Sequence, residues 1–210
     1  MTSNAQMSED DWEQLALEAL AELGWAPTAG AAIAPGTGER DSWSDPVITS
    51  RFLEALRRLN PTVPLDLLHQ AMADILTPRS QDAITENQRI HEWVVAGYRG
   101  LSWTDQDGVE QNPTLRLISA DPAENDWLAV NQVTLVDRDH ERRFDVVLFV
   151  NGLPVTVLEL KKAGSAKADV AAAHAQLQTY LREFPMAFRS LCSLSRVTAC
   201  SPSTAPRSPR

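Results

Sequence analysis

Two runs that are mostly apolar make up one central stretch of the chain, residues 143–161, and each run is of strand length. Successive side chains of a β-strand point to opposite faces of its sheet, and in both halves of this stretch most positions on both faces are apolar. Asn151 and Gly152 stand between the two halves. Because both residue types tolerate a positive φ, this pair is a strong hairpin signal. The pattern predicts a buried central hairpin.

Three charged residues interrupt the apolar hairpin: Asp145 in its first strand, and Glu159 and Lys161 in its second. An unpaired buried charge costs on the order of several kcal/mol. One reading is a buried Glu159–Lys161 ion pair, with Asp145 at an exposed strand end. The other is a divalent-metal site, in which two carboxylates bind a hard cation and the lysine stabilises negative charge or orients a water. These three residues alone leave both readings open.

The register of the hairpin decides whether Asp145 and Glu159 can share a cation. A two-residue loop sets Asp145 opposite Leu158, on the wrong face for Glu159. A loop of three or five residues sets Asp145 opposite Glu159, with Cβ atoms roughly 5 Å apart, and a β-bulge near Asp145 would do the same. The metal reading therefore requires an odd-length loop or a bulge.

Helical periodicity dominates residues 8–100. A capping-box pattern at Ser8 predicts the start of an amphipathic helix, and Gly24 ends it. Residues 26–48 are rich in Ala, Pro, Gly and Ser, which predicts a long loop. Three further helices are expected at about residues 49–58, 64–77 and 83–97.

Residues 111–162 change to a strand-like pattern, with strands expected at residues 115–118 and 127–136 before the hairpin. A helix is then expected over residues 165–183. Residues 1–7 are expected to be disordered. Ser, Pro and Arg dominate residues 189–210, which are interpreted as an aberrant tail from out-of-frame translation or from gene-boundary noise, also without fixed structure.

Composition narrows the class of protein. The chain has 210 residues and a formal net charge of −9, which argues against a stand-alone DNA-binding protein with a basic stripe. No apolar run approaches a membrane span, no secretory signal is visible, and the two cysteines lie in the tail. The expected location is the cytoplasm. No phosphate-binding loop motif is present, so no ATP site is expected in this chain.

Several separated motifs, in this order, resemble the N-terminal nuclease domain of the restriction (motor) subunit of type I restriction enzymes, a member of the PD-(D/E)xK superfamily. The hairpin carries the main match, although Phe144 stands where the family's motif usually has Pro. The other matching segments are Leu59-Asn60-Pro61, Asn87-Gln88-Arg89-Ile90-His91, Asn131-Gln132-Val133-Thr134 and Gln176-Leu177-Gln178-Thr179-Tyr180.

The resemblance implies an α/β, restriction-endonuclease-like core over residues 8–188, with a central mixed, mostly antiparallel sheet flanked by helices. It implies a type I site-specific deoxyribonuclease that hydrolyses DNA phosphodiester bonds with Mg²⁺. In the family, ATP is used only by the intact subunit, and the partners are DNA and the methylation and specificity subunits.

The resemblance also implies roles for individual residues. Asp145 and Glu159 would hold the metal, and Lys161 would orient the attacking water. Gln176 and Tyr180 lie four apart, hence on one helix face, and would position the phosphate.

A helix carboxylate would complete the metal shell, with Glu86 as the candidate and Glu92 as the alternative. A rim of basic residues would face the DNA backbone: Arg142, Arg143, Lys162 and Lys167. The rival interpretation is a truncated, non-catalytic remnant or binding module that keeps the fold without cutting.

Overall fold

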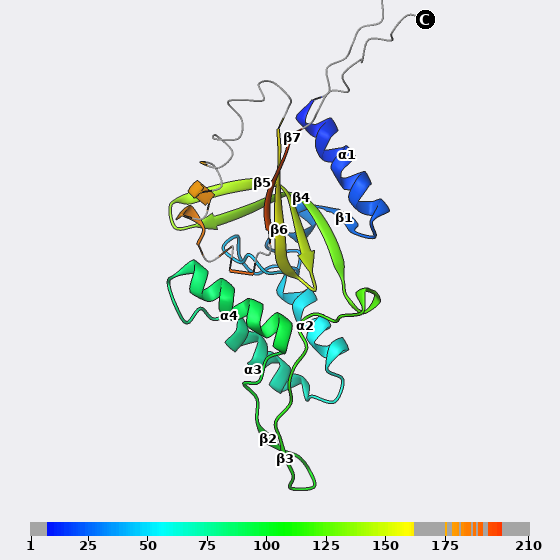
Figure 1. Cartoon of the computed structure of the whole chain (residues 1–210), viewed down its shortest axis with the longest axis vertical. Coiled ribbons are helices and arrows are strands. Elements are labelled where there is room, and N and C mark those ends of the chain that lie inside the picture. The colour runs from blue at the N-terminus through cyan, green and yellow to red at the C-terminus, as the bar shows by residue number, and fades with distance from the viewer. Residues whose placement is uncertain are drawn as a thin grey trace, which may run out of the picture.

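A five-stranded mixed sheet forms the centre of the molecule (Figure 1). The computed structural model describes residues 8–161, 175, 178–180, 182–185, 187, 189–190 and 193–198. The strand order is β1-β4-β5-β6-β7. The β4–β5 and β5–β6 pairs are antiparallel, whereas β1 pairs with β4, and β7 with β6, in parallel. The strands are β1 (Ala26–Ala29), β4 (Trp127–Asp137), β5 (His140–Val150), β6 (Leu153–Lys161) and β7 (Ser193–Thr198).

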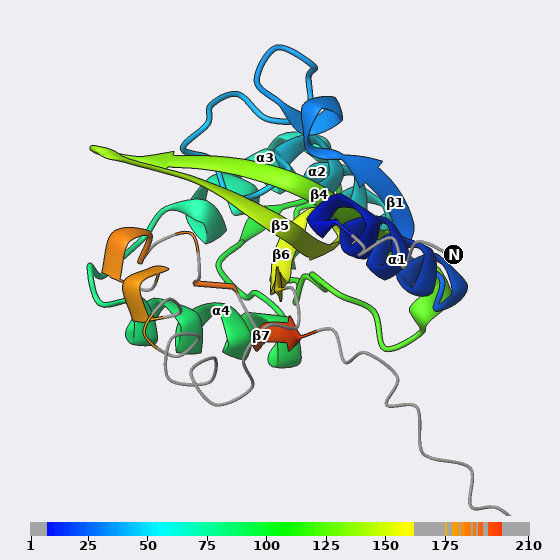
Figure 2. The same ribbon diagram turned by 90° about the horizontal axis from the view of Figure 1, so that it is seen from above.

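Within residues 8–161, four α-helices accompany the sheet, which confirms the expected mixed α/β architecture. In the view from above, α1 and α4 lie on opposite sides of β6 (Figure 2). Two short 3-10 helices, η1 and η2, and a small separate hairpin of β2 and β3 complete the described elements. Their bounds are α1 (Glu9–Glu22), α2 (Thr49–Leu59), α3 (Leu65–Leu76), α4 (Ala83–Ala96), η1 (Gly30–Ile33), η2 (Pro122–Glu124), β2 (Trp103–Thr104) and β3 (Glu110–Gln111).

The helix starts follow their sequence signals. Ser8 and Asp11 form the expected capping box, in which each side chain accepts a hydrogen bond from the other residue's backbone N–H. At α4, the Asp82 side chain accepts the N–H of Thr85. Of the helix expected over residues 165–183, the described residues 175, 178–180 and 182–183 are helical. Among the described residues, no helix is long and apolar enough to cross a membrane.

Three expectations differ from the structure. Residues 115–118 form no strand, and Leu115 makes only an isolated bridge with Tyr98. Strand β1 lies in the segment that was expected to be a loop. The sequence did not predict it because four residues are too few to show a strand period. Strand β7 lies within the tail expected to be disordered, where it pairs with β6 and gives the sheet a fifth strand.

Three apolar clusters hold these layers together. One joins α1 to one sheet face through Leu17, Val146, Leu148 and Leu160. A second gathers around Phe144, Val147, Phe149 and Val157 with Tyr180 and Phe184. The third fills the space between α2, α3 and α4 and reaches the sheet at Leu153. The sheet is therefore covered on both faces, which agrees with the apolar pattern of its central strands.

The Asn151–Gly152 turn fixes the hairpin to the helices. Asn151 has a φ of 52°, is fully buried, and donates to the Leu117 carbonyl at 2.9 Å. Its Oδ1 accepts from Arg58 of α2 at 3.0 Å. The Gly152 carbonyl accepts the Ile48 N–H just before α2 at 2.9 Å. The turn therefore positions α2 as well as joining β5 to β6.

Candidate active site

A β-bulge in the central hairpin brings Asp145 opposite Glu159. Near the turn, Phe149 pairs with Pro154, as a two-residue loop requires, but the register shifts between Leu148 and Phe149, so that Val146 pairs with Leu158. Carried one residue further, this register sets Asp145 across from Glu159. The bulge thus supplies the condition that the sequence set for a shared cation.

The Asp145 carboxylate lies between β5 and β6. Its Oδ2 accepts the backbone N–H of Leu160 at 2.7 Å, and the described pairing of the two strands ends next to it, at Val146 and Leu158. Asp145 is half-buried, whereas Glu159 is only 3% exposed. A backbone amide therefore orients one carboxylate beside a second, buried one.

The β4 side of Asp145 is irregular too. Asn131 pairs with Val146 and Val133 with Phe144, which places Gln132 across from Asp145. Gln132 has a φ of 54°, a conformation that few non-glycine residues adopt. Backbone strain of this kind collects at functional sites, and here it directs the Gln132 side chain toward α1.

Glu13 of α1 is the helix carboxylate that the structure brings to this site, and sequence reasoning missed it. It is 8% exposed and accepts a hydrogen bond from the Gln132 side-chain amide. Burial raises the pKa of the Glu13 carboxyl, and the negative charge of Asp145 raises it further, while the Gln132 bond lowers it. The available signal was a glutamate on the apolar face of α1, close to the buried Leu17.

The two helix carboxylates singled out in the sequence have other neighbours. Glu86 is fully buried, and its Oε1 accepts the N–H groups of Arg79 and Ser80 at 3.0 and 2.9 Å. Its Oε2 forms an ion pair with Arg89. Glu92 is exposed and accepts from Gln88 at 3.3 Å. Glu86 therefore ties the loop before α4 to that helix.

Tyr180 packs against the start of β5. It is 6% exposed, and its ring meets that of Phe144 edge-on, with centroids 5.1 Å apart. Phe184 meets the other side of the same cluster, 6.0 Å from Phe144. Lys161 is the last residue of β6, and its side chain lies outside the described part of the structure, as does Gln176. The structure thus brings Tyr180 next to the residue that precedes Asp145.

Of the four basic residues expected to face DNA, two lie among the described residues and two do not. Arg142 and Arg143 are exposed on β5, and Arg142 forms an ion pair with Glu183 at 3.0 Å. The hydrogen bond that Arg142 donates to the Glu183 carboxylate raises the pKa of the Arg142 guanidinium. Lys162 and Lys167 lie outside the described residues.

The donor set suits a hard divalent cation. Asp145, Glu159 and Glu13 offer carboxylate oxygens, the ligands that Mg²⁺ and Ca²⁺ prefer. Among the described residues, no three His, Cys, Asp or Glu side chains converge closely enough to hold a metal ion by themselves.

Comparisons with known proteins identify relatives of the chain. The family model described as "Type I restriction enzyme R protein N terminus" matches residues 6–194. Over 186 residues the chain is 31% identical to the type I restriction enzyme HindI endonuclease subunit of Haemophilus influenzae, covering 87% of this chain and 17% of that protein. It is 24% identical over 192 residues to the putative type I restriction enzyme MjaIXP endonuclease subunit of Methanocaldococcus jannaschii, covering 88% and 18%. The chain therefore spans less than a fifth of these relatives.

Proposed function

The chain belongs to the family of type I restriction enzyme R protein N-terminal domains, and from that premise we propose that it is a nuclease domain that hydrolyses DNA phosphodiester bonds with Mg²⁺. The observation that carries the proposal is the bulged register, which brings Asp145 opposite Glu159 and leaves the Asp145 carboxylate between the strands. A regular two-residue hairpin would have separated these two groups.

In this proposal, Asp145 and Glu159 hold the cation, with waters and the Leu160 backbone carbonyl as further oxygen ligands. Bound there, Mg²⁺ would supply Lewis-acid activation of a water and neutralise charge on the scissile phosphate. Glu13 of α1 adds negative charge near Asp145, although the described carboxylates do not converge closely enough to hold an ion by themselves. That charge, inside a mostly apolar core, favours a divalent cation.

The remaining groups act on water and phosphate. Lys161 leaves β6 two residues after Glu159, on the same strand face, so its ammonium would orient the attacking water and stabilise the charge that develops on the phosphate. Tyr180, held against Phe144, and Gln176 would position the phosphate. Exposed Arg143, with Arg142, Lys162 and Lys167, would contact the DNA backbone.

The activity of the whole subunit is a wider proposal. Because the chain spans 17% of the first relative, we assign ATP dependence, and the methylation and specificity subunits, to the longer protein in which such a domain works. A non-catalytic remnant that binds DNA or protein is the second candidate, and the formal net charge of −9 favours it.

Cleavage of plasmid DNA by the purified chain tests the function. With Mg²⁺, the wild type should nick supercoiled DNA weakly and without sequence specificity, and Asp145→Asn should lower the rate at least about 100-fold. Asp139→Asn is the matched control, because Asp139 is an exposed carboxylate at the β4–β5 turn. Calorimetric titration with Mn²⁺ gives a second readout. A wild-type chain that binds DNA but neither cuts it nor binds Mn²⁺ favours the non-catalytic candidate.

A further inference from the structure

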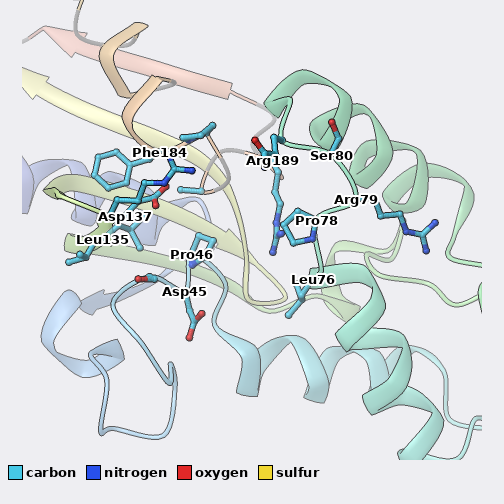
Figure 3. A pocket seen from close by; sticks show the side chains of 16 residues that line it. Asp45, Pro46, Leu76, Pro78, Arg79, Ser80, Leu135, Asp137, Phe184 and Arg189 are labelled. Carbon is cyan, nitrogen blue, oxygen red and sulfur yellow. The ribbon is translucent and has the colours of Figure 1, made fainter.

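A cavity of about 700 Å³ opens beside the candidate active site, between the loop before α2, the loop before α4, the end of β4 and the segment after Tyr180 (Figure 3). Its volume falls in the range of small-molecule pockets. Its lining includes Ser44, Asp45, Ser80, Gln81, Phe184 and Arg189.

Arg189 is the unusual group in this lining. Its side chain extends into the space between Pro46 and Pro78, whereas Arg79 is directed away (Figure 3). Arg189 is only 7% exposed. Within the described part of the chain, its guanidinium donates no hydrogen bond and forms no ion pair within 4.0 Å, although Asn87 donates to its backbone carbonyl at 2.9 Å. Buried arginines are almost always paired. The nitrogens of Arg189 are not among the described side-chain atoms that are buried without a partner, so the guanidinium is open to the cavity.

The neighbouring charges do not supply an acceptor for this guanidinium. Burial lowers the pKa of the Arg189 guanidinium, and the positive charge of Arg89 lowers it further. The negative charges of Glu86 and Asp45 raise the pKa of Arg189, but both carboxylates have other hydrogen-bond or ion-pair partners. Asp45 accepts the Ser42 N–H at 2.9 Å, and Glu86 pairs with Arg89.

We propose that this cavity binds a phosphate group, with the Arg189 guanidinium as its principal ligand. The planar guanidinium presents five N–H donors in a fork that matches phosphate oxygens two at a time. Ser44, Ser80 and Gln81 line the same space and carry further donors. A phosphate has more acceptor oxygens than a carboxylate, so it can accept hydrogen bonds from more of these side chains.

Two sources could supply the phosphate: the backbone of DNA, or a free phosphate or nucleotide. The DNA source rests on the proposed function and is favoured by position. Phe184 lines the cavity and packs on Phe144 beside Tyr180, so the cavity lies next to the candidate nuclease centre. A DNA strand in that centre would pass near it.

The test is thermal unfolding of the 210-residue chain in EDTA, which makes it independent of metal and cleavage. Three ligands are compared: inorganic phosphate, a 5′-mononucleotide, and a single-stranded oligonucleotide without a terminal phosphate. Acetate is the carboxylate comparison. The wild type should show a saturable Tm rise with at least one phosphate ligand, because ligands that bind only the folded state stabilise it. A response to the oligonucleotide assigns the site to the DNA backbone, and a response confined to the other two assigns it to a free phosphate.

Arg189→Met should abolish this Tm rise without lowering the Tm of the ligand-free chain, because it replaces an unpaired buried charge by an apolar side chain. Arg57→Met is the matched control, since Arg57 is exposed on α2 and outside the cavity, and it should keep the full response. Three results would each overturn the proposal: no phosphate response in the wild type, an equal response in Arg189→Met, or an equal response to acetate. A wild type without a phosphate response, together with a lower Tm for ligand-free Arg189→Met, would make Arg189 a structural residue instead.

Discussion

At the residue scale, two kinds of polar group are found in the interior. Some are satisfied by hydrogen bonds and stabilise the fold, whereas others are candidates for metal binding. Tyr98 belongs to the first kind: it is 3% exposed and donates to Asp74 at 2.7 Å. Glu13 and Asp145 belong to the second, because a helix and a strand bring two carboxylates together without an intervening arginine or lysine among the described residues. Sequence could locate Asp145, since a charge in an apolar strand is conspicuous. It could not locate Glu13, whose role depends on how α1 packs across the sheet.

Glu13→Gln should separate stability from metal binding. Burial and the charge of Asp145 raise the pKa of Glu13, so ionisation of Glu13 lowers the stability of the folded chain relative to the unfolded chain. The amide should therefore raise the Tm of the metal-free chain and weaken Mn²⁺ binding by about tenfold or more. Glu22→Gln, on the exposed end of the same helix, should change neither. A loss of Tm without a change in Mn²⁺ affinity would give Glu13 a purely structural role.

Tyr98 gives a pH prediction. Burial, and then the hydrogen bond to Asp74, raise the pKa of Tyr98 from 10.0 to about 12. Between these values the unfolded chain loses this proton before the folded chain does, so the free energy of unfolding should fall as pH rises from 10 toward 12. Urea unfolding at several pH values, with phenolate absorbance followed in parallel, measures this. Tyr98→Phe should flatten that part of the profile.

At the element scale, the central hairpin shows how far sequence reasoning reaches. Its strands, its Asn151–Gly152 turn and the need for a bulge or odd loop all followed from the period-two pattern and from the positions of the charges. The location of the bulge, between Leu148 and Phe149, did not follow, because it depends on how the turn docks against α2. Strand β1 was missed for a related reason: a four-residue strand is defined by its partner β4, not by its own sequence.

Gly152→Ala should disrupt this docking. A Cβ atom at Gly152 would lie 2.4 Å from the Ile48 carbonyl oxygen and 2.8 Å from the Phe52 nitrogen, and φ is +79°. Gly108→Ala is the matched control, because its φ is +80° and a Cβ atom there meets nothing within 4 Å. The control should cost about 1–2 kcal/mol of unfolding free energy from backbone strain alone, and Gly152→Ala should cost clearly more. Equal losses in urea unfolding would mean that the turn is not packed tightly against α2.

At the scale of the whole molecule, a parallel edge strand, β7, completes the sheet and lies beside β6, the strand that carries Glu159. The interpretation of residues 189–210 as wholly aberrant is corrected on this point, and the family match continues to residue 194. Sequence failed here because a six-residue strand of mostly polar side chains is specified by pairing with β6. The candidate active site is thus supported on its β6 side by a segment whose composition resembles a disordered tail.

If the nuclease chemistry belongs to this domain, a substitution in the domain should abolish DNA cleavage without affecting ATP hydrolysis. In a longer subunit that carries this domain, Lys161→Ala should abolish DNA cleavage, because the ammonium beside Glu159 would no longer orient the water or stabilise charge on the phosphate. ATP hydrolysis should stay at the wild-type rate, since the motif for an ATP site is absent from this chain. Arg57→Ala, an exposed change on α2, should leave both activities intact. Plasmid cleavage and phosphate release are measured on the same preparations. If Lys161→Ala still cuts DNA, the central hairpin is not the nuclease centre.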